Sequence, residues 1–243
     1  MLFKKYLFLL YFCCCTTIAT AETTIPEYFE VDYTLYSNDT KIGLMERRFF
    51  MHEDGNYTFR SESKTTGLIA LFRKDHIIEE SQWHINGVQF TPLNYIYQHT
   101  GGKKDRDVEI KFNWEKQKIT NRVNDSTWHM DTEPGILDKL LYQLAIMASL
   151  KAGSVPESYT IADGGKIKQY QFEYMHDEVI DTPLGEFKTM KLIRHKPNND
   201  RKTFLWFAND LDFLPIKVIN EEKKGRLTTA IIQSLNGFGF NKE

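Results

Sequence analysis

The sequence predicts a mostly β protein, with a large curved antiparallel sheet, or a half-open β barrel or sandwich, arranged around one central α-helix. The first observation is that apolar and polar residues alternate in roughly a dozen segments, which turn residues separate at intervals of about 8 to 12 residues. The second is that only one segment, at about 132–152, has the three- and four-residue apolar spacing of a helix. Because no linker rich in Pro, Gly or Ser interrupts this pattern, we expect a single β-rich domain over residues 22–243.

The first 21 residues have the composition of a signal peptide. Lys4 and Lys5 precede an apolar run over 6–18, and Ala19-Thr20-Ala21 is the small-x-small pattern that a signal peptidase cleaves. A membrane-spanning helix needs about 20 apolar residues, so this run is too short to be an anchor. We therefore predict cleavage after Ala21, a periplasmic or secreted mature chain, and no transmembrane segment after cleavage.

All three cysteines lie inside this predicted signal peptide, at Cys13, Cys14 and Cys15. A lipoprotein signal has small residues just before its cysteine, whereas Tyr11 and Phe12 occupy those positions, so lipidation is disfavoured. The mature chain then contains no cysteine, and we expect neither disulfides nor thiolate chemistry.

The charges argue against a nucleic-acid partner. Without Lys4 and Lys5, 29 basic residues (31 minus 2) stand against 33 acidic ones, and neither sign forms a long block. The aromatic content of 14% suits wide strands and a broad apolar interior.

Strands are predicted on both sides of the helix. In the first strand, Phe29, Val31 and Tyr33 alternate with polar residues and mark a buried face. Asn86-Gly87 is the strongest short hairpin signal, and Pro92 in the next segment indicates a sheet edge or a bulge. The predicted strands lie at 28–36, 41–51, 57–64, 75–85, 88–98, 105–114, 119–123 and 127–130 before the helix, and at 159–163, 167–176, 179–181, 186–195, 203–208, 214–220 and 226–234 after it.

The predicted helix should bury its main apolar stripe, which includes Leu140 and Leu144. Asp131 or Thr132 would cap its start, and Gly153 would stop it. We expect the opposite side to face solvent, and with it Asp138, whose replacement by alanine should then be nearly neutral.

A second apolar side of the helix leaves two interpretations open. Tyr142, Ile146 and Leu150 fall outside the main stripe. Either both sides are buried against the sheet, or one side faces a groove that takes an apolar chain. A third interpretation is a surface patch for a partner protein. The apolar run at 66–72 lacks alternation and is either a buried crossing or a mobile flap at such a groove.

Several stretches together resemble an exported bacterial family, the domain of unknown function 3108 (DUF3108). They are TGLIALF at 66–72, FNW at 112–114, LLYQL at 140–144, TPLGEF at 182–187 and LWFANDLDFLPIKVI at 205–219. The resemblance covers nearly the whole mature chain. It implies no established activity and no catalytic residues. The segment DTEP at 131–134 departs from the Asp-Pro wording expected of the family at that point.

A weaker likeness concerns the end of the chain. Trp206, then Leu214-Pro215, then a charged hairpin at 221–226 is similar to the closing strands of LolA/LolB-type periplasmic lipoprotein carriers. That likeness implies a half-open barrel lidded by helix, and it implies nothing about the cargo.

No pattern of reactive side chains indicates an enzyme or a metal site. Ser61 and Ser63 lack a Gly-x-Ser-x-Gly elbow, and Glu79 and Glu80 are neighbours in a strand, so they point to opposite faces. The turn at 101–104 precedes a strand, so it is not a phosphate-binding loop. No two histidines have the spacing of paired ligands; they lie at His52, His76, His84, His99, His129, His176 and His195. We therefore expect no catalytic residue, no metal and no cofactor.

The sequence thus favours an exported, non-enzymatic envelope protein that binds or carries an apolar ligand, such as a lipid or a lipoprotein acyl chain. Side chains from the flap, the sheet and the helix would form the site: Leu68, Ile69, Leu71, Phe72, Phe112, Trp114, Leu140, Leu144, Ile146 and Trp206. The alternative is a ligand-free scaffold or interaction module with an envelope protein partner. A hydrolase of envelope polymers is the third possibility, and it would need polar residues that converge in a cleft.

Overall fold

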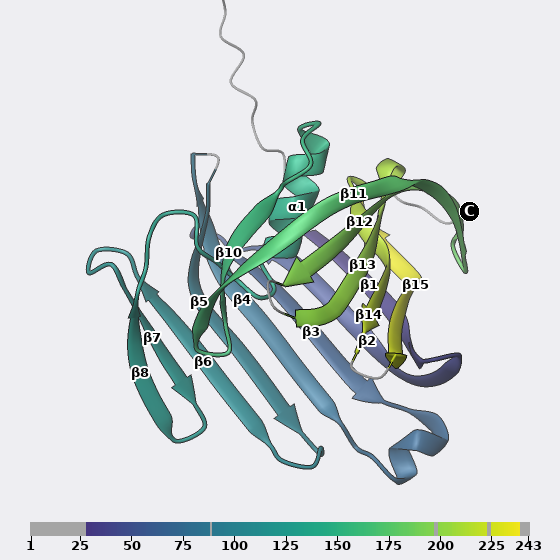
Figure 1. The fold of residues 1–243 in the computed structure, drawn as a ribbon, viewed down its shortest axis with the longest axis horizontal. Helices are drawn as coiled ribbons and strands as arrows, with labels where there is room; N and C mark the ends of the chain where they lie inside the picture. The colour runs from purple at the N-terminus through teal and green to yellow at the C-terminus, as the bar shows by residue number, and fades with distance from the viewer. Residues whose placement is uncertain (1–27, 88, 197–198, 223–224, 239–243) are drawn as a thin grey trace, which may run out of the picture.

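In the described part of the chain, fifteen strands form one curved sheet that does not close into a barrel (Figure 1). The computed structural model describes residues 28–87, 89–196, 199–222 and 225–238. The strand order is β8-β7-β6-β5-β4-β3-β2-β1-β15-β14-β13-β12-β11-β10-β9, so the first and last strands of the chain's own order meet at the centre of the sheet. The predicted mostly β class, with a curved sheet and one α-helix, is confirmed. The predicted signal peptide lies outside the described residues.

The strands before the helix are β1 (Tyr28–Ser37), β2 (Thr40–Met51), β3 (Tyr57–Thr65), β4 (His76–Asn86), β5 (Gln89–Thr100), β6 (Arg106–Asn113), β7 (Lys118–Val123), β8 (Ser126–Asp131) and β9 (Leu137–Asp138). The strands after it are β10 (Ser158–Asp163), β11 (Lys166–Thr182), β12 (Gly185–Lys196), β13 (Asn199–Ala208), β14 (Leu214–Glu221) and β15 (Leu227–Gly237). The helical elements are α1 (Tyr142–Lys151) and two 3-10 helices, η1 (Gly67–Leu71) and η2 (Asn209–Leu211).

Alternation along each strand separates an inner, concave face from an outer one. In β1, Phe29, Val31 and Tyr33 are fully buried, as their spacing predicts. The pairing register places Phe49 of β2 opposite Phe29 and Phe59 of β3 opposite Phe49, so these rings share the inner face. The strands pair antiparallel, except that β9 runs parallel to β10. The register shifts where Trp83 faces Pro92, which confirms the bulge expected at this proline.

The helix is shorter than the sequence predicts, because it begins at Tyr142 rather than near residue 132. Before it, Leu137 and Asp138 pair with Ile161 and Ala162 of β10 and so continue the sheet. The expected cap at Asp131 or Thr132 is therefore wrong. The end is as predicted: α1 stops at Lys151, and Gly153 has the left-handed φ of 75° that suits a glycine after a helix.

None of the helices in the described ranges is both long and apolar enough to cross a lipid bilayer.

Candidate functional site on the concave face

The helix α1 lies across the concave side of the sheet, between β4 on one side and β10 to β12 on the other (Figure 1). Both apolar sides of the helix are buried: Leu144 belongs to the main stripe, and Tyr142, Ile146 and Leu150 belong to the second. Of the interpretations left open by the sequence, the structure therefore shows the one in which both sides are packed. We take the interior around α1 as the candidate functional site, because polar groups are buried there among apolar ones.

Arg47 is the most unusual group of this interior. It shares the phase of Phe49 in β2, so its side chain points inward, and it is only 9% exposed. Its Nη1 donates to Oε1 of Gln143 in α1 at 2.9 Å, and its guanidinium lies 5.4 Å from the ring centre of Tyr33 and 5.9 Å from that of Phe59. Burial raises the pKa of Tyr33 to about 12, with Arg47 opposing the shift. Within the described ranges, no carboxylate lies within ion-pair distance of Arg47, and its Nε has no hydrogen-bond partner.

Asp138 holds the start of α1 against the sheet. Its Oδ1 accepts hydrogen bonds from the backbone N–H groups of Leu140 and Leu141, both at 2.8 Å, and its Oδ2 accepts one from Ser81 Oγ of β4 at 2.5 Å. The carboxyl is fully buried, and burial raises its pKa to about 6 although these three donors oppose the shift. The expectation that Asp138 faces solvent is wrong, because the residue belongs to β9 and not to a helix.

A partly buried ion pair lies beside Asp138. Lys139 Nζ is 2.6 Å from Glu79 Oε1, which also accepts a hydrogen bond from Tyr95 Oη at 2.7 Å. The Lys139 ammonium lies 5.0 Å from the ring centre of Tyr97. Burial alone would raise the pKa of Glu79, but the charge and hydrogen bond of Lys139 outweigh it and lower the pKa. Glu80 points to the outer face and pairs with Arg60 at 3.0 Å, so the two adjacent carboxylates lie on opposite faces as predicted.

A second set of polar contacts ties the far side of α1 to β11–β13. Arg194 Nη1 donates to Tyr142 Oη at 2.6 Å, and Arg194 Nη2 donates to Thr203 Oγ1 at the same distance. Asp163 accepts from Lys168 at 2.7 Å and from Tyr170 at 2.8 Å. Burial would raise the pKa of Asp163, but its bond with Lys168 outweighs it and lowers the pKa to about 2. The helix is therefore fixed on both sides by polar contacts as well as by packing.

A band of aromatic rings crosses the inner face beyond these groups. Phe29 stacks on Phe49 with ring centres 5.2 Å apart, and Phe49 lies 6.1 Å from Trp83. Trp83 also stacks on Tyr57 at 4.6 Å and lies 4.9 Å from Phe90. The Trp83 indole N–H is buried without a hydrogen-bond partner in the described part of the chain. Native proteins rarely leave such donors unpaired. This N–H and Arg47 Nε could therefore each donate a hydrogen bond to an acceptor on a ligand.

The structure distributes the predicted binding residues over three places. Phe112, Leu140, Leu144 and Ile146 are buried in one continuous core, with Trp114 packed against it. Trp114 stacks on Phe112 at 5.9 Å and donates its indole N–H to the Pro92 carbonyl at 2.8 Å. These residues share the interior, as the prediction requires. Their role in ligand binding stays a prediction.

The flap residues are not at this site. Leu68, Ile69 and Leu71 belong to η1, which Phe72 follows directly, and η1 joins β3 to β4 at the end of the sheet away from α1 (Figure 1). The expectation that this segment covers the same opening as α1 is wrong. The reason is topological: η1 connects β3 and β4 at the ends of these long strands that lie away from α1.

Trp206 lies on the outer face, not the inner one. Its neighbours Thr203, Leu205 and Phe207 share the inner phase of β13, since Thr203 contacts Arg194 beneath α1. Trp206 instead donates its indole N–H to Glu178 at 2.5 Å and lies between the ammonium groups of Lys191 and Lys217, at 4.7 and 4.9 Å from its ring centre. Trp206 is nonetheless buried, at 4% exposed, and it belongs to the same hydrophobic core cluster as Phe112 and Leu140.

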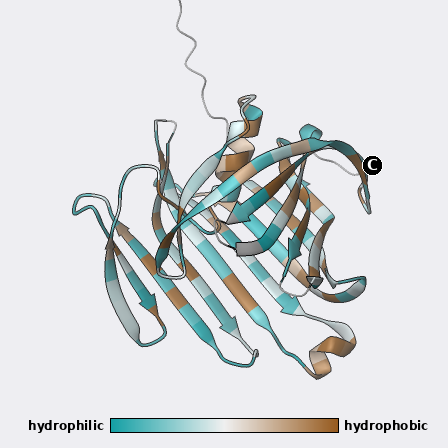
Figure 2. Ribbon diagram, viewed as in Figure 1, coloured by the Kyte–Doolittle hydropathy of each residue, from teal (hydrophilic) through white to brown (hydrophobic). Residues whose placement is uncertain are grey.

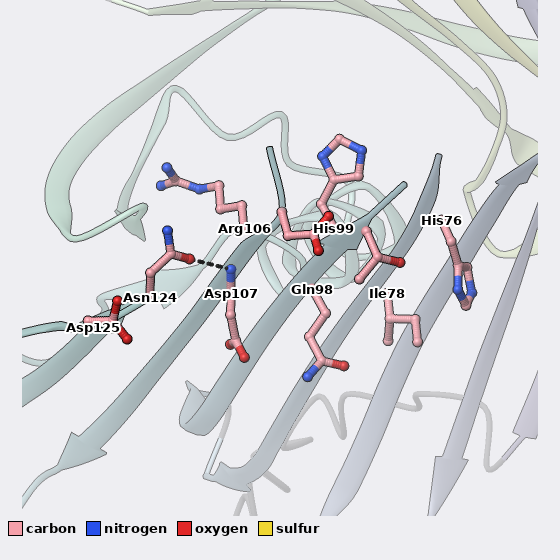
Figure 3. A pocket seen from close by; sticks show the side chains of 10 residues that line it. His76, Ile78, Gln98, His99, Arg106, Asp107, Asn124 and Asp125 are labelled. Carbon is pink, nitrogen blue, oxygen red and sulfur yellow. Dashed lines mark hydrogen bonds between the residues drawn. The ribbon is translucent and has the colours of Figure 1, made fainter. Parts of the chain in front are cut away.

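A polar pocket of about 470 Å³ opens at the ends of β4 to β7 (Figure 3). Gln98, Ile78 and Asp107 lie together on one side of the strands in Figure 3, while Arg106 and His99 point the other way. Asn124 accepts a hydrogen bond from the Asp107 backbone N–H at 2.9 Å. His76 and His99 each pair with a carboxylate, Glu62 and Asp75, at 2.8 Å. In the described ranges, no three His, Cys, Asp or Glu side chains form a metal-binding group.

The sequence analysis missed the polar residues of the interior. Arg47 had a detectable signal, since it occupies the same alternation phase as Met45 and Phe49 in β2. Asp138 and Lys139 had a weaker one, because they interrupt an otherwise apolar run. The pairing of Lys139 with Glu79, sixty residues away in sequence, had no local signal.

In the described residues, the fold and this interior define a mostly β protein with one α-helix held on the concave face of an open sheet. A family described as "Protein of unknown function (DUF3108)" matches residues 29–231, and the chain belongs to this family. A search of curated protein sequences gave no match.

Three solved structures that match this chain share little sequence with it. A β-barrel-like protein of DUF1849 from Brucella abortus has a TM-score of 0.56 at 8% identity, over 88% of this chain and 98% of that chain. A domain assigned to outer membrane lipoprotein sorting from Vibrio parahaemolyticus has a TM-score of 0.26 at 10% identity, over 88% and 87%. The MucA/MucB complex of Pseudomonas aeruginosa gives 0.18 at 7% identity, over 86% and 93%. The first likeness shows the fold alone, and the other two carry no argument about function.

Proposed function

We propose that this protein is an exported, periplasmic, non-enzymatic protein that binds an amphiphile, an acyl chain with an anionic head, on the concave face beside α1. The signal-like N-terminus supports export, and the aromatic band and α1 supply the apolar surface for the chain. Lipids and the acyl chains of lipoproteins belong to this ligand class.

The observation that carries the proposal is the buried guanidinium of Arg47. Burying a charge without a counter-ion is costly, and proteins normally pair such a charge or let it bind a ligand. Arg47 is held in place by Gln143 of the helix, while its Nε remains without a partner in the described part of the chain. The charge of Arg47 helps to lower the pKa of Glu79, but in the described ranges no carboxylate pairs with the guanidinium at contact distance. A carboxylate or phosphate that accepts from this Nε would be such a partner.

The apolar part of the ligand would lie along the aromatic band. The Trp83 ring lies 6.1 Å from Phe49, which is two residues from Arg47 in β2, so the anionic site and the band are neighbours. Each methylene removed from water contributes about 0.8 kcal/mol, so a chain of about a dozen methylenes offsets the cost of association and leaves micromolar binding. Because α1 is buried on both sides, the chain would enter by displacing the helix from the sheet.

The experiment compares two adjacent arginines on opposite faces. Arg47→Met removes the inner guanidinium, and Arg48→Met removes an outer one that pairs with Glu30 and Glu46. In titrations with a fluorescent fatty acid, we expect Arg47→Met to weaken binding about tenfold, since a hydrogen bond to a charged group contributes about 1.5 to 3 kcal/mol. Arg48→Met should bind like the wild type.

The methyl ester of the same fatty acid separates charge recognition from folding. It should bind the wild type and Arg47→Met equally, because it carries no negative head. Thermal unfolding of each variant is measured alongside. The proposal fails if the wild type shows no saturable binding, or if the two arginine variants lose affinity equally.

A second candidate function is a scaffold or interaction module with a filled interior and an envelope protein partner. The complete burial of Ile146 on the second side of α1 favours it. In that case the fatty acid does not bind, and Arg47→Met changes only stability. Ile146 itself is a poor site for the binding test, because a polar side chain there is expected to unfold the protein.

A further inference from the structure

The connection between β3 and β4 carries three apolar side chains that are largely exposed to solvent. We call residues 67–72 the η1 tip. Leu68, Leu71 and Phe72 are 78%, 72% and 87% exposed, and none of the residues of η1 is buried. In Figure 2 the tip is the brown turn at the extreme end of the sheet. Single exposed apolar residues are ordinary, but three on one protruding turn mark a contact surface.

The η1 tip is held in a fixed conformation rather than left loose. Thr65 closes its base twice: its backbone N–H donates to the Asp75 carbonyl at 3.0 Å, and its hydroxyl donates to the Arg73 carbonyl at 2.7 Å. Thr66 N–H donates to the Ile42 carbonyl of β2 at 3.1 Å. The apolar side chains are therefore presented to solvent by a braced turn, which lowers the entropic cost of binding.

Basic residues surround the base of the η1 tip. Lys64, Arg73 and Lys74 flank it in sequence and are exposed. The next turn adds Lys103 and Lys104, because Gly101 packs so closely on Lys74 that a Cβ there would lie 1.9 Å from its carbonyl oxygen. Arg73 pairs with Asp75 at 2.9 Å, whereas the lysines extend the positive charge around the apolar tip.

We propose that the η1 tip docks this protein on an anionic lipid bilayer, with Leu68, Leu71 and Phe72 inserted at the headgroup level. A convex apolar tip within a basic ring matches the layered chemistry of a bilayer surface, where acyl chains lie beneath negative headgroups. A protein groove would also accept apolar side chains, but it gives no reason for the surrounding ring of lysines. The inference concerns a surface remote from the interior site, so it stands whether or not that site binds an amphiphile.

The test measures binding to vesicles of phosphatidylcholine with and without phosphatidylglycerol. The protein is purified after export, so that any signal peptide has been removed by the cell. Replacing Leu68, Leu71 and Phe72 together with serine should weaken binding at least tenfold. Lys64→Gln with Lys74→Gln should weaken binding several-fold to the anionic vesicles only, and raised salt should reproduce that loss in the wild type.

A matched control uses the exposed apolar residues of β11, where Tyr174, Met175 and Val179 are 43%, 41% and 57% exposed. Their joint replacement with serine should leave vesicle binding unchanged. If the tip triple variant does not fold, Phe72→Ser alone replaces it. The proposal is overturned if the wild type does not bind anionic vesicles, if the control triple loses as much binding, or if the tip variants lose only a co-purifying protein.

Discussion

Two apolar helical segments of this protein, the α-helix α1 and the 3-10 helix η1, have similar side chains but differ in burial. The helix α1 is buried on both sides between the two halves of the sheet, and η1 has no buried residue. Each follows a strand and each is a short run without alternation. What differs is the chain around them: α1 is preceded by the short edge strand β9, which pairs with β10, and η1 sits in the connection between β3 and β4 at the sheet's far end.

The comparison shows that apolar content alone does not decide burial. α1 is anchored by Asp138, Arg47 and Arg194, whose hydrogen bonds reach it from three parts of the sheet. Around η1, hydrogen bonds brace the backbone only and leave the side chains outside. We infer that the contacts of α1 serve the interior of the protein, and that η1 is fixed for contact with something outside it.

The largest effect is expected from an unpartnered charge in α1. Leu144→Asp places a carboxylate where the native side chain is 4% exposed, and this should cost several kcal/mol of a total unfolding free energy of about 5 to 15 kcal/mol. The matched change Leu71→Asp in η1 should cost less than about 0.5 kcal/mol. Urea unfolding of both variants measures the contrast. Equal losses would mean that the two turns do not differ in burial.

A smaller but specific effect is expected at Asp138. Asp138→Ala leaves two backbone N–H groups and the Ser81 hydroxyl without their acceptor, and the loss should be about 2 kcal/mol or more. Asp138→Asn keeps an acceptor for the backbone, so it should lose less. Urea unfolding at about pH 4, where the contribution of this carboxyl is present, ranks the two variants, and an alanine variant as stable as the wild type contradicts the anchoring role.

The same carboxyl should make stability depend on pH in a defined direction. Its pKa rises from 3.8 when unfolded to about 6 when folded, so the folded protein holds the proton more tightly. The contribution of Asp138 to stability is therefore fully present below about pH 4 and is lost as the pH rises through about 6, by on the order of 3 kcal/mol. Asp163, with its pKa lowered to about 2, acts in a lower pH range. A wild type and an Asp138→Asn variant with parallel pH profiles between 4 and 6 would refute this.

Much of the fold was readable from the sequence because it depends on local patterns. Alternation predicted strands such as β1 and β6, and Pro92 predicted the bulge in β5. The start of the helix was mispredicted because the spacing of Ile136 and Leu137 fits a helix, whereas a tertiary contact with β10 draws this stretch into the sheet. Pairing between distant segments has no periodic signature.

The interior site was less predictable for the same reason. Phe112, Leu140 and Leu144 were identified by hydrophobicity and do share the core. Trp206 was assigned to the wrong face, since alternation gives two faces but does not say which one is concave. Glu79 with Lys139 and Arg47 with Gln143 are contacts across the fold, and only the three-dimensional register of β2 and β4 with α1 brings them together.

The smallest effect on stability is expected at the most exposed apolar residue of the tip. Phe72→Ser should change the free energy of unfolding by less than about 0.5 kcal/mol, because 87% of the residue is already in contact with solvent. Phe59→Ser, on the inner face and 2% exposed, should cost about 3 kcal/mol or more. Urea unfolding of both variants checks this. A loss above about 1 kcal/mol at Phe72 would show that its ring packs inside the protein and would remove the reason to place it in a membrane. An unchanged free energy of unfolding would mean that the Phe72 ring does not stabilise the fold. Its role would then lie in what the η1 tip contacts outside the protein.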